Sequence, residues 1–410
     1  MTYDLIIIGG GAAGLAAAVF VTGEKPHSKV LVLEKNPRVG KKLMATGNGT
    51  CNLTNITATA ADYHGAPALA DKALKALTIP QTMDFFTAIG VDCITREDGK
   101  VYPASQQAGA VLDALRLTAE AQGVTILCEQ KVTALKQNKG GWTVQTEGDT
   151  YAATTVLVAV GGAAAPALGG SAEGYRLLTD LGCQKTPLFP SIVQLRTATD
   201  FVRAVKGIRV DATLTLTLNN RELARNTGEV LFTDYGLSGP AVMQISRPAG
   251  DWERQKKGPL TAHLDLLPDW DKEDLTARIM ERSHLPGRTL EDLLTGLTHK
   301  RVGQTILRVA EILPLSRPAD SLNQDEAAWI ATILKDWCLP VTGTQGFGGA
   351  QVTAGGIDAA EVNDTFALKR LPGVYAVGEV LDVDGDCGGY NLQFAWSSAY
   401  VAAMDIAKRL

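Results

Sequence analysis

Short runs that are wholly or largely apolar and rich in β-branched residues recur along the chain and predict strands buried on both faces of a parallel sheet. They cover residues 5–8, 30–33, 154–160 and 374–377. An alanine-rich segment, 15–22, lies between the first two runs and has a helical character. Alternation of strand and helix is typical of an α/β fold, and the positions of the runs assign both ends of the chain to one such domain.

The middle of the chain has a different texture. Residues 212–218 alternate apolar and polar side chains with a period of two, and the following Asn219-Asn220 is a hairpin turn signal. Residues 260–264 alternate again, and 339–342 form another short strand. These strands predict a β-rich, barrel-like insert within the α/β domain.

Residues 272–335, between the strands of this insert, have a helical texture. Leu290, Leu293, Leu294 and Leu297 recur at helical spacing and predict a helix face packed within a small bundle. The predicted division of the chain is a Rossmann-like domain at 1–190 plus 355–410, a barrel-like insert at 191–267 plus 336–354, and a helical insert at 268–335.

A glycine-rich turn follows the first predicted strand directly. Gly9, Gly11 and Gly14 have the spacing G-x-G-x-x-G, with Ala12 and Ala13 between the last two. Gly9 permits a tight turn, Gly11 lets a pyrophosphate approach the backbone, and Gly14 lets the helix pack close to the strand. Because a helix N-terminus also offers free N–H groups to phosphates, these residues predict a dinucleotide site.

Glu34 ends the second predicted strand, 20 residues after Gly14. A carboxylate at this point accepts hydrogen bonds from a ribose and repels a 2′-phosphate. It therefore favours the adenosine of FAD or NAD over that of NADP. This part of the sequence leaves FAD and NAD as alternatives.

Two later strand ends favour FAD. The strand that ends near residue 160 continues into Gly161-Gly162, and the strand near the C-terminus continues into Gly378-Glu379. In flavoproteins with two dinucleotide-binding domains, the corresponding strand near the C-terminus ends in Gly-Asp, and this aspartate contacts the ribityl chain of the flavin. Glu379, Asp382 and Asp384 are the alternatives for that acid here.

A second glycine pair precedes a predicted C-terminal helix at 392–408. The helix N-terminus that follows the pair would stabilise the anionic reduced flavin at the N1/O2 edge of its ring system. A plain capped helix is the alternative. The residues that this interpretation places at the flavin are Gly389, Tyr390, Asn391 and Leu392.

Charge and sequence patterns argue against several other classes of protein. The 410 residues carry a net charge of −5, with a pI near 5.7, which argues against a nucleic-acid-binding domain. No apolar run reaches the roughly 18 residues that a membrane span needs, and no signal peptide is evident. A second G-x-G-x-x-G is absent, which argues against a reductase with its own NAD(P)H domain.

The six cysteines are scattered, without a C-x-x-C pair, and reduced thiols are expected. The five histidines do not cluster with the cysteines in the sequence, so we predict no metal site. Cys51 lies in a glycine-rich loop, where a flavin contact and a small buried thiol are alternatives. His263 alternates with apolar neighbours and is expected to be a structural histidine on a strand face.

Five stretches of the sequence match motifs of one family: residues 40–55, 100–103, 228–240, 352–357 and 378–393. On these stretches the chain resembles the BaiN-type (YhiN-like) FAD-dependent oxidoreductases. The resemblance implies a Rossmann-like FAD-binding domain of the two-dinucleotide-binding-domain flavoprotein type, interrupted by a barrel-like and a small helical domain. Members of the family have been linked to the reduction of bile-acid-like enones and to aminoacetone oxidation.

The resemblance also extends the predicted FAD site. It adds Val132 and the loop Gly47-Asn48-Gly49. Lys35, Lys41 and Lys42 form a basic cluster near the phosphates, of which Lys35 and Lys41 are assigned to the site, with solvated surface lysines as the alternative. Two positions depart from the family pattern: Asn48-Gly49-Thr50 lacks the usual arginine, and Asp234 replaces the usual histidine. Roles of those two family residues therefore do not carry over.

The sequence predicts an FAD-dependent oxidoreductase that reduces an unsaturated or carbonyl-containing small molecule, with NADH or NADPH as a candidate electron donor. We expect a cytoplasmic protein without a metal, a membrane or a nucleic-acid partner. One alternative is an oxidase of a small amine or ketone. Another is a flavin-dependent RNA-modifying or RNA-binding protein. A third is a non-catalytic flavin-binding interaction module. No catalytic residue is assigned.

Overall fold

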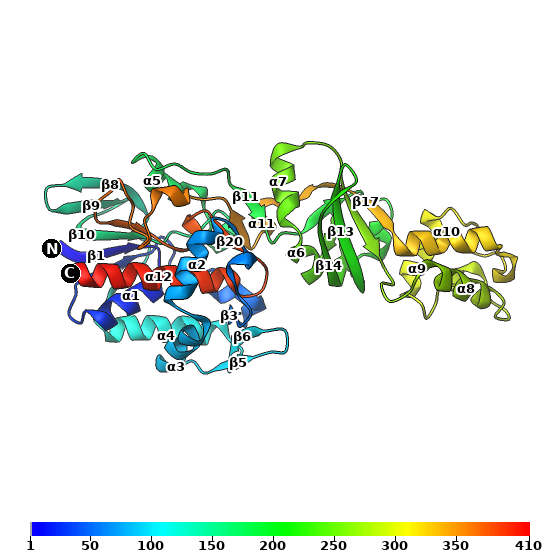
Figure 1. Cartoon of the computed structure of the whole chain (residues 1–410), viewed down its shortest axis with the longest axis horizontal. Helices are drawn as coiled ribbons and strands as arrows, with labels where there is room; N and C mark the ends of the chain where they lie inside the picture. Colours follow the sequence, from blue (N-terminus) through cyan, green and yellow to red (C-terminus); the bar gives the residue numbers. More distant parts are fainter. Residues whose placement is uncertain (1) are drawn as a thin grey trace. The chain divides into compact units, whose positions relative to one another are not determined.

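The computed structural model of the chain describes residues 2–410 (Figure 1). The chain forms two compact units, one made of Met1–Phe189 and Gln351–Leu410 and the other of Pro190–Ala350. In the described part of the chain, no helix is both long enough and apolar enough to cross a membrane.

A seven-stranded sheet forms the centre of the first unit. Its order is β7-β2-β1-β10-β9-β8, and β19 also pairs with β10. The pairs that join β7, β2, β1, β10 and β19 are parallel, whereas β9 pairs antiparallel with both β10 and β8. The strands are β1 (Thr2–Ile8), β2 (Val30–Leu33), β7 (Thr125–Leu127), β8 (Val132–Asn138), β9 (Gly141–Thr146), β10 (Thr150–Val158) and β19 (Val374–Ala376).

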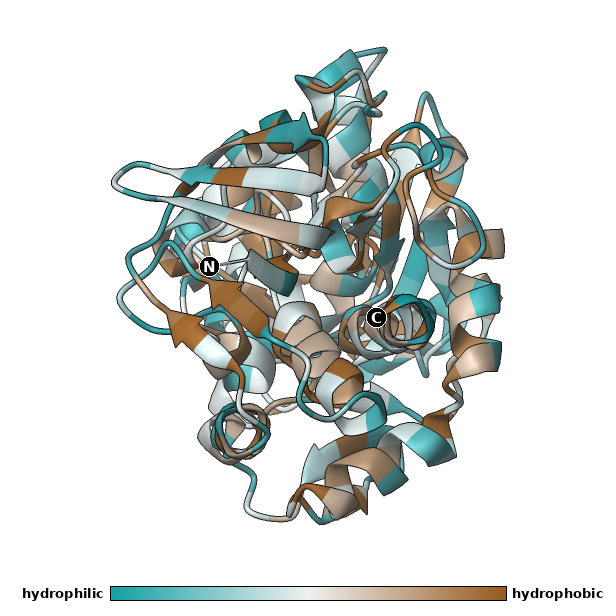
Figure 2. Cartoon of the chain, turned by 90° about the vertical axis from the view of Figure 1, so that its left-hand side faces the viewer, coloured by the Kyte–Doolittle hydropathy of each residue, from teal (hydrophilic) through white to brown (hydrophobic). Residues whose placement is uncertain are grey.

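The apolar runs of the sequence become the parallel core of this sheet. Residues 5–8 and 30–33 are buried throughout, because neighbouring helices and loops cover the sheet. Figure 2 shows hydrophobic colouring on the strands beside the N-terminus and hydrophilic colouring on much of the connecting chain. The first-unit helices are α1 (Ala12–Glu24), α2 (Pro67–Ala76), α3 (Ile79–Ala88), α4 (Ala108–Ala121), α5 (Arg176–Thr179) and α12 (Tyr390–Arg409). The predicted α/β fold is confirmed.

Short strands connect the loops of the first unit. β3 (Thr54–Asn55) pairs with β6 (Lys100–Pro103), which also pairs with β5 (Cys93–Thr95). β20 (Val383–Gly385) pairs with β4 (Tyr63–Gly65), so a segment close to the C-terminus is hydrogen-bonded to one close to the N-terminus. These pairs fix the loops that follow the carboxyl ends of the central strands.

A closed six-stranded barrel, in the order β12-β15-β14-β13-β16-β17, dominates the second unit. Asn219 and Asn220 join β13 to β14 with φ values of +51° and +64°, as a two-residue turn with both central residues at positive φ requires. The predicted strands therefore belong to a barrel. Its strands are β12 (Leu195–Thr197), β13 (Arg209–Leu218), β14 (Arg221–Phe232), β15 (Gly236–Ser238), β16 (Leu260–Asp265) and β17 (Trp337–Thr344).

Helices complete the second unit: α6 (Pro240–Gln244), α7 (Arg247–Gln255), α8 (Lys272–Ser283), α9 (Lys300–Val309), α10 (Gln324–Lys335) and α11 (Gly346–Gly349). The prediction of a helix from the leucine stripe is wrong. Leu290, Leu293 and Leu294 are buried, but only a short 3₁₀ turn, Leu290–Asp292, forms there. Gly287 and Gly296, both at positive φ, bound a segment too short to sustain a helix.

Candidate functional site

The glycine turn between β1 and α1 contains glycines of two kinds. A Cβ at Gly9 would lie 2.4 Å from the Ala159 carbonyl oxygen, and a Cβ at Gly14 would lie 1.9 Å from the Gly9 carbonyl oxygen. These two glycines therefore allow close packing of the backbone. A Cβ at Gly11 would meet no atom within 4 Å, so Gly11 faces open space at the start of α1.

Glu34, at the end of β2, is only 7% exposed and is held beside this turn. Its carboxylate accepts hydrogen bonds from the Gly10 N–H at 2.9 Å and from the Asn36 N–H at 2.8 Å. Its own carbonyl accepts from the Gln130 N–H at 2.8 Å, which brings the segment that leads into Val132 alongside. Glu34, the glycine turn and this segment thus form one neighbourhood.

Glu379, among the three acids considered for the ribityl contact, lies beside the glycine loops. Its Oε2 pairs with Lys42 Nζ at 2.6 Å, and its Oε1 accepts from the Thr353 N–H at 2.8 Å. A Cβ at Gly162 would lie 2.6 Å from the same Oε1. The sequence placed Lys42 in a basic cluster with Lys35 and Lys41, but the pairing of Lys42 with Glu379 was not predicted, and only Lys35 and Lys41 were assigned to the site. Lys41 and Lys42 are chemically identical there, and the fold alone distinguishes them.

The other two acids lie near β4. A carboxylate oxygen of Asp382 lies 2.4 Å from the Cβ position of Gly65, the last residue of β4. Asp384 is fully buried in β20, opposite His64 of β4. Neither contact is with the glycine turn between β1 and α1.

The glycine turn and the C-terminal segment meet directly. Gly378 has a φ of +70°, and its N–H donates to Ser398 Oγ at 3.0 Å. A Cβ at Gly378 would lie 3.1 Å from the Ala13 Cβ, at the start of α1. Two loops that are more than 360 residues apart therefore border one region.

The loop that contains Gly47, Asn48 and Gly49 is exposed, and all three residues have positive φ values. A Cβ at Gly49 would meet nothing within 4 Å, as is also true of Gly161 after β10. Cys51, further along the loop, is fully buried, and burial raises the pKa of its thiol to about 12. The structure therefore favours the interpretation of Cys51 as a buried, unreactive thiol.

Gly389 precedes α12 with a φ of +99°. A Cβ there would lie 2.6 Å from the Thr54 carbonyl oxygen, so the Gly388-Gly389 turn packs on the loop of residues 47–55. Asn391 uses its side chain within this turn: its Oδ1 accepts from the Gly385 N–H and its Nδ2 donates to the Gly385 carbonyl. The Asn391 amide therefore holds the turn together.

The remaining predicted residues lie around the edge of this region. Lys35 is exposed after β2, and desolvation lowers the pKa of its amine against the opposing attraction of Glu34. Tyr390 and Leu392 are half-buried in the first turn of α12. Desolvation raises the pKa of the Tyr390 hydroxyl, which keeps it protonated at neutral pH.

The residues fit FAD because several glycines leave open space beside the backbone. Gly11, Gly49 and Gly161 leave open space where a ligand needs close approach to the backbone, and the start of a long helix borders the same region. In addition, Asn52 Oδ1 and Thr54 Oγ1, in the loop that Gly389 contacts, are buried without a hydrogen-bond partner among residues 2–410.

The sequence pattern of the HI0933-like protein Rossmann domain matches residues 3–405. The chain belongs to this family. The resemblance inferred from the five sequence stretches is therefore confirmed, and it extends over nearly the whole chain.

Curated relatives of this HI0933-like chain have two different names. It is 36% identical over 408 residues to "3-dehydro-bile acid delta(4,6)-reductase" of Clostridium scindens, with 98% of both chains covered. It is 31% identical over 410 residues to "ribosomal RNA dihydrouridine synthase" of Escherichia coli, again with 98% of both chains covered. A Haemophilus influenzae protein of the latter name is 29% identical over 415 residues.

Solved structures share the fold of this HI0933-like chain. A 3-ketosteroid delta1-dehydrogenase from Sterolibacterium denitrificans matches with a TM-score of 0.55 and 12% identity, and both chains are covered completely. A quinol-fumarate reductase matches with a TM-score of 0.53 and 18% identity, over 100% of this chain and 71% of that one. At such identities the likeness shows the fold alone.

The departure from the family pattern at Asp234 has a local structural role. Its carboxylate forms an exposed ion pair with Lys206 at 2.5 Å, and the hydrogen bond from Lys206 lowers the pKa of Asp234.

Proposed function

We propose that the chain is an FAD-dependent reductase that delivers hydride to a carbon–carbon double bond conjugated with a carbonyl group in a small organic molecule. The observation that carries the proposal is the meeting of Ala13 and Gly378, because one extended cofactor held by both loops explains their approach. The 36% identity to a named reductase over 98% of the chain supports the reaction type.

We assign each part of FAD to a group of the first unit. Glu34 would hold the adenosine ribose, and the backbone N–H groups of Ala12 and Ala13 would bind the pyrophosphate. Glu379, oriented by Lys42 and the Thr353 N–H, would accept hydrogen bonds from the ribityl hydroxyls. When bound, the flavin supplies the hydride chemistry, and the protein supplies its binding, orientation and electrostatics.

The first turn of α12 would stabilise negative charge on the reduced ring system. The first N–H groups of a helix have no intrahelical partner, and the helix dipole is positive at that end. The loop Gly47-Asn48-Gly49 would form the neighbouring wall. For the electron donor we propose NADH or NADPH, bound transiently, since the sequence has only one G-x-G-x-x-G.

The substrates that the relatives' names imply share one chemical feature. A 3-oxo steroid with double bonds at positions 4 and 6, and a uracil ring, each contain an alkene conjugated with a carbonyl. Such an alkene accepts hydride at its β-carbon while charge develops on the carbonyl oxygen. Hydride transfer to a conjugated alkene therefore fits both kinds of relative. The two kinds of substrate, a steroid and an RNA, differ in size and charge.

Charge distribution favours a small molecule over RNA. The second unit carries 19 Lys and Arg against 20 Asp and Glu, and the first unit carries 20 against 24. Several cations of the second unit are also paired within it, as in Arg209–Glu229, Lys300–Asp292 and Arg317–Glu326. RNA-binding domains carry an excess of basic residues, and neither unit has one. The names of two relatives nevertheless support ribosomal RNA, which is therefore the second candidate substrate.

Free thiols support the proposed location. All six cysteines are unpaired in the structure. Reduced cysteines are typical of proteins in reducing compartments, and we therefore propose the cytoplasm.

Anaerobic reduction of the purified flavoprotein tests the proposal. We expect the chromophore released by denaturation to be FAD, and its absorbance in the holoprotein to bleach with NADH or NADPH. Reoxidation by a 3-oxo-Δ4,6 bile acid would support the small-molecule reductase. Reoxidation only by a ribosomal RNA transcript would assign the RNA reaction instead. Bleaching by a small amine or ketone, with reoxidation by oxygen, would assign the oxidase.

A further inference from the structure

Three side chains with metal-binding atoms converge on the outer face of the barrel. His263 of β16 lies directly opposite Cys338 of β17, and Asp336 precedes β17 by one residue. Their neighbours Leu264 and Leu339 are buried, so His263 and Cys338 point away from the barrel core. A histidine and a cysteine that are 75 positions apart in the sequence are thus neighbours in the barrel.

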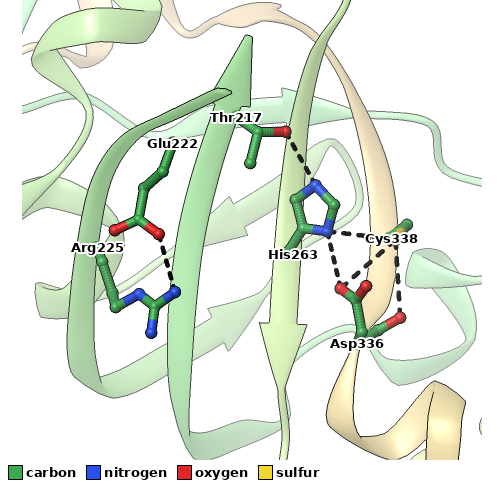
Figure 3. Close-up of polar contacts among 6 residues, drawn as sticks. All are labelled: Thr217, Glu222, Arg225, His263, Asp336 and Cys338. Carbon is green, nitrogen blue, oxygen red and sulfur yellow. Dashed lines mark hydrogen bonds and ion pairs between the residues drawn. The ribbon is translucent and has the colours of Figure 1, made fainter. Parts of the chain in front are cut away.

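The three potential ligand atoms are at mutual distances that suit one ion (Figure 3). His263 Nδ1 lies 2.8 Å from Asp336 Oδ1 and 3.4 Å from Cys338 Sγ, and Sγ lies 3.5 Å from Oδ1. Ligands of a tetrahedral zinc ion are separated by about 3.3–3.6 Å, given its usual bond lengths. Both sulfur distances agree with this geometry, and the nitrogen–oxygen pair needs to open by roughly half an ångström.

The arrangement does not match a nucleophilic triad. In such a triad the imidazole uses one nitrogen for the thiol and the other for the acid. Here Asp336 and Cys338 both approach Nδ1, while Nε2 lies 2.9 Å from Thr217 Oγ1 of β13. A hydroxyl that accepts from Nε2–H fixes the ring with its Nδ1 lone pair facing the other two groups, as in many metal sites.

We propose that His263 Nδ1, Asp336 Oδ1 and Cys338 Sγ bind one Zn²⁺ ion, with water in the remaining position. A thiolate with an imidazole selects zinc over magnesium and calcium, which prefer oxygen ligands. Asp336 and Cys338 are exposed, so an ion has access. Glu222, the nearby acid in Figure 3, pairs with Arg225 at 2.8 Å and does not complete the site.

A bound ion would change the chemistry of the Cys338 sulfur. A cysteine binds a metal as the thiolate, so binding of the ion displaces the thiol proton and commits a sulfur lone pair to the metal. The ion would therefore protect the sulfur from alkylation.

The position of the site indicates its role. α10 ends at Lys335 and β17 begins at Trp337, so Asp336 is the junction at which the chain leaves the helices and returns to the barrel. Next to it, Lys335 Nζ pairs with Asp265 Oδ2 of β16 at 2.7 Å. An ion shared by Asp336, Cys338 and His263 would tie this junction to β16 and stabilise the second unit.

Equilibrium dialysis of tag-free protein against buffered micromolar ZnSO₄ tests the site. We expect about one zinc per chain, with affinity reduced by about tenfold or more in Cys338→Ser and in His263→Gln, and by about tenfold in Thr217→Val. Cys93→Ser and His27→Gln, at a half-buried cysteine and an exposed histidine, are the matched controls and should bind as the parent does. Equal zinc uptake by all five variants, or none by the parent, would overturn the proposal.

Two further readouts locate the ion. In the parent, Co²⁺ should give the near-ultraviolet charge-transfer absorption of a thiolate ligand, and Cys338→Ser should lack it. Zn²⁺ should slow the alkylation of Cys338, followed by mass spectrometry, and raise the thermal midpoint of the parent but not of His263→Gln. Circular dichroism and flavin content check that each variant folds. An unchanged alkylation rate at saturating zinc would exclude Cys338 as a ligand.

Discussion

Lys42 Nζ lies 2.6 Å from Glu379 Oε2, a carboxylate 337 residues further along the chain. The pair is partly buried, with 31% and 19% of the two side chains exposed. It therefore connects the loop after β2 to the segment after β19 and fixes the orientation of an acid whose other oxygen is held by the Thr353 N–H. This geometry makes Glu379 the acid to test for the ribityl contact.

Glu379→Gln should weaken FAD binding by about 1–3 kcal/mol, because a charge-assisted hydrogen bond is lost. Lys42→Met should weaken it less, since the lysine acts through the carboxylate. Calorimetric titration of the apoproteins with FAD measures both effects, and the double variant gives their coupling. Lys25→Met, at an exposed lysine directly after α1, is the control. Fully additive single effects would show that Lys42 does not act through Glu379.

Gly11 and Gly14 should separate cofactor binding from folding. Gly14→Ala places a methyl group 1.9 Å from the Gly9 carbonyl oxygen and should destabilise the apoprotein by about 1–3 kcal/mol. Gly11→Ala meets no atom within 4 Å and should leave apoprotein stability nearly unchanged while weakening FAD binding. Urea unfolding and FAD titration of both variants check this. Normal FAD affinity in Gly11→Ala would place the pyrophosphate elsewhere.

Glu34→Gln should affect both stability and FAD affinity. The carboxylate accepts from the N–H groups of Gly10 and Asn36, and an amide cannot accept with both of its polar atoms. We expect a loss of about 1–3 kcal/mol in FAD binding and of about 1–2 kcal/mol in apoprotein stability. Glu24→Gln, at an exposed glutamate at the end of α1, serves as the control. Unchanged FAD affinity would contradict the ribose contact.

Asp405 should make the first unit sensitive to acid. Burial raises the pKa of its carboxyl, but the hydrogen bonds from Tyr375 at 2.5 Å and Arg409 at 2.9 Å outweigh burial, so the pKa is lowered overall. A lowered folded-state pKa stabilises the fold above the unfolded value of about 3.9, and this contribution is lost as pH falls through the folded value.

Asp405→Asn should therefore be less stable than the parent by about 1–2 kcal/mol at pH 7, with the difference shrinking below pH ~4. Urea unfolding at several pH values measures the difference. Asp71→Asn, in an exposed i,i+4 pair with Lys75, should cost less than about 0.5 kcal/mol at any pH. A difference for Asp405→Asn that grows on acidification would contradict the assigned sign.

The sequence predicted the elements in which local pattern and burial agree. Residues 5–8 and 30–33 are wholly apolar, and only a strand covered on both faces accommodates such runs. Asn219-Asn220 tolerates positive φ and so specified its hairpin. The helix predicted from the leucine stripe does not form, although the spacing of the leucines suits a helix. The glycines at 287 and 296 bound the segment and leave it too short for a helix.

The tertiary structure alone decided which chemically equivalent residues share a site. Lys41 and Lys42 are identical in type and adjacent, and the fold directs Lys42 to Glu379. Nothing in the sequence relates His263 to Cys338, because strand pairing in a barrel depends on closure of the whole sheet. Periodicity is a local property that each segment carries by itself. The meeting of distant side chains depends on the register and packing of every element between them, and so the sequence determined the elements while the fold determined the sites.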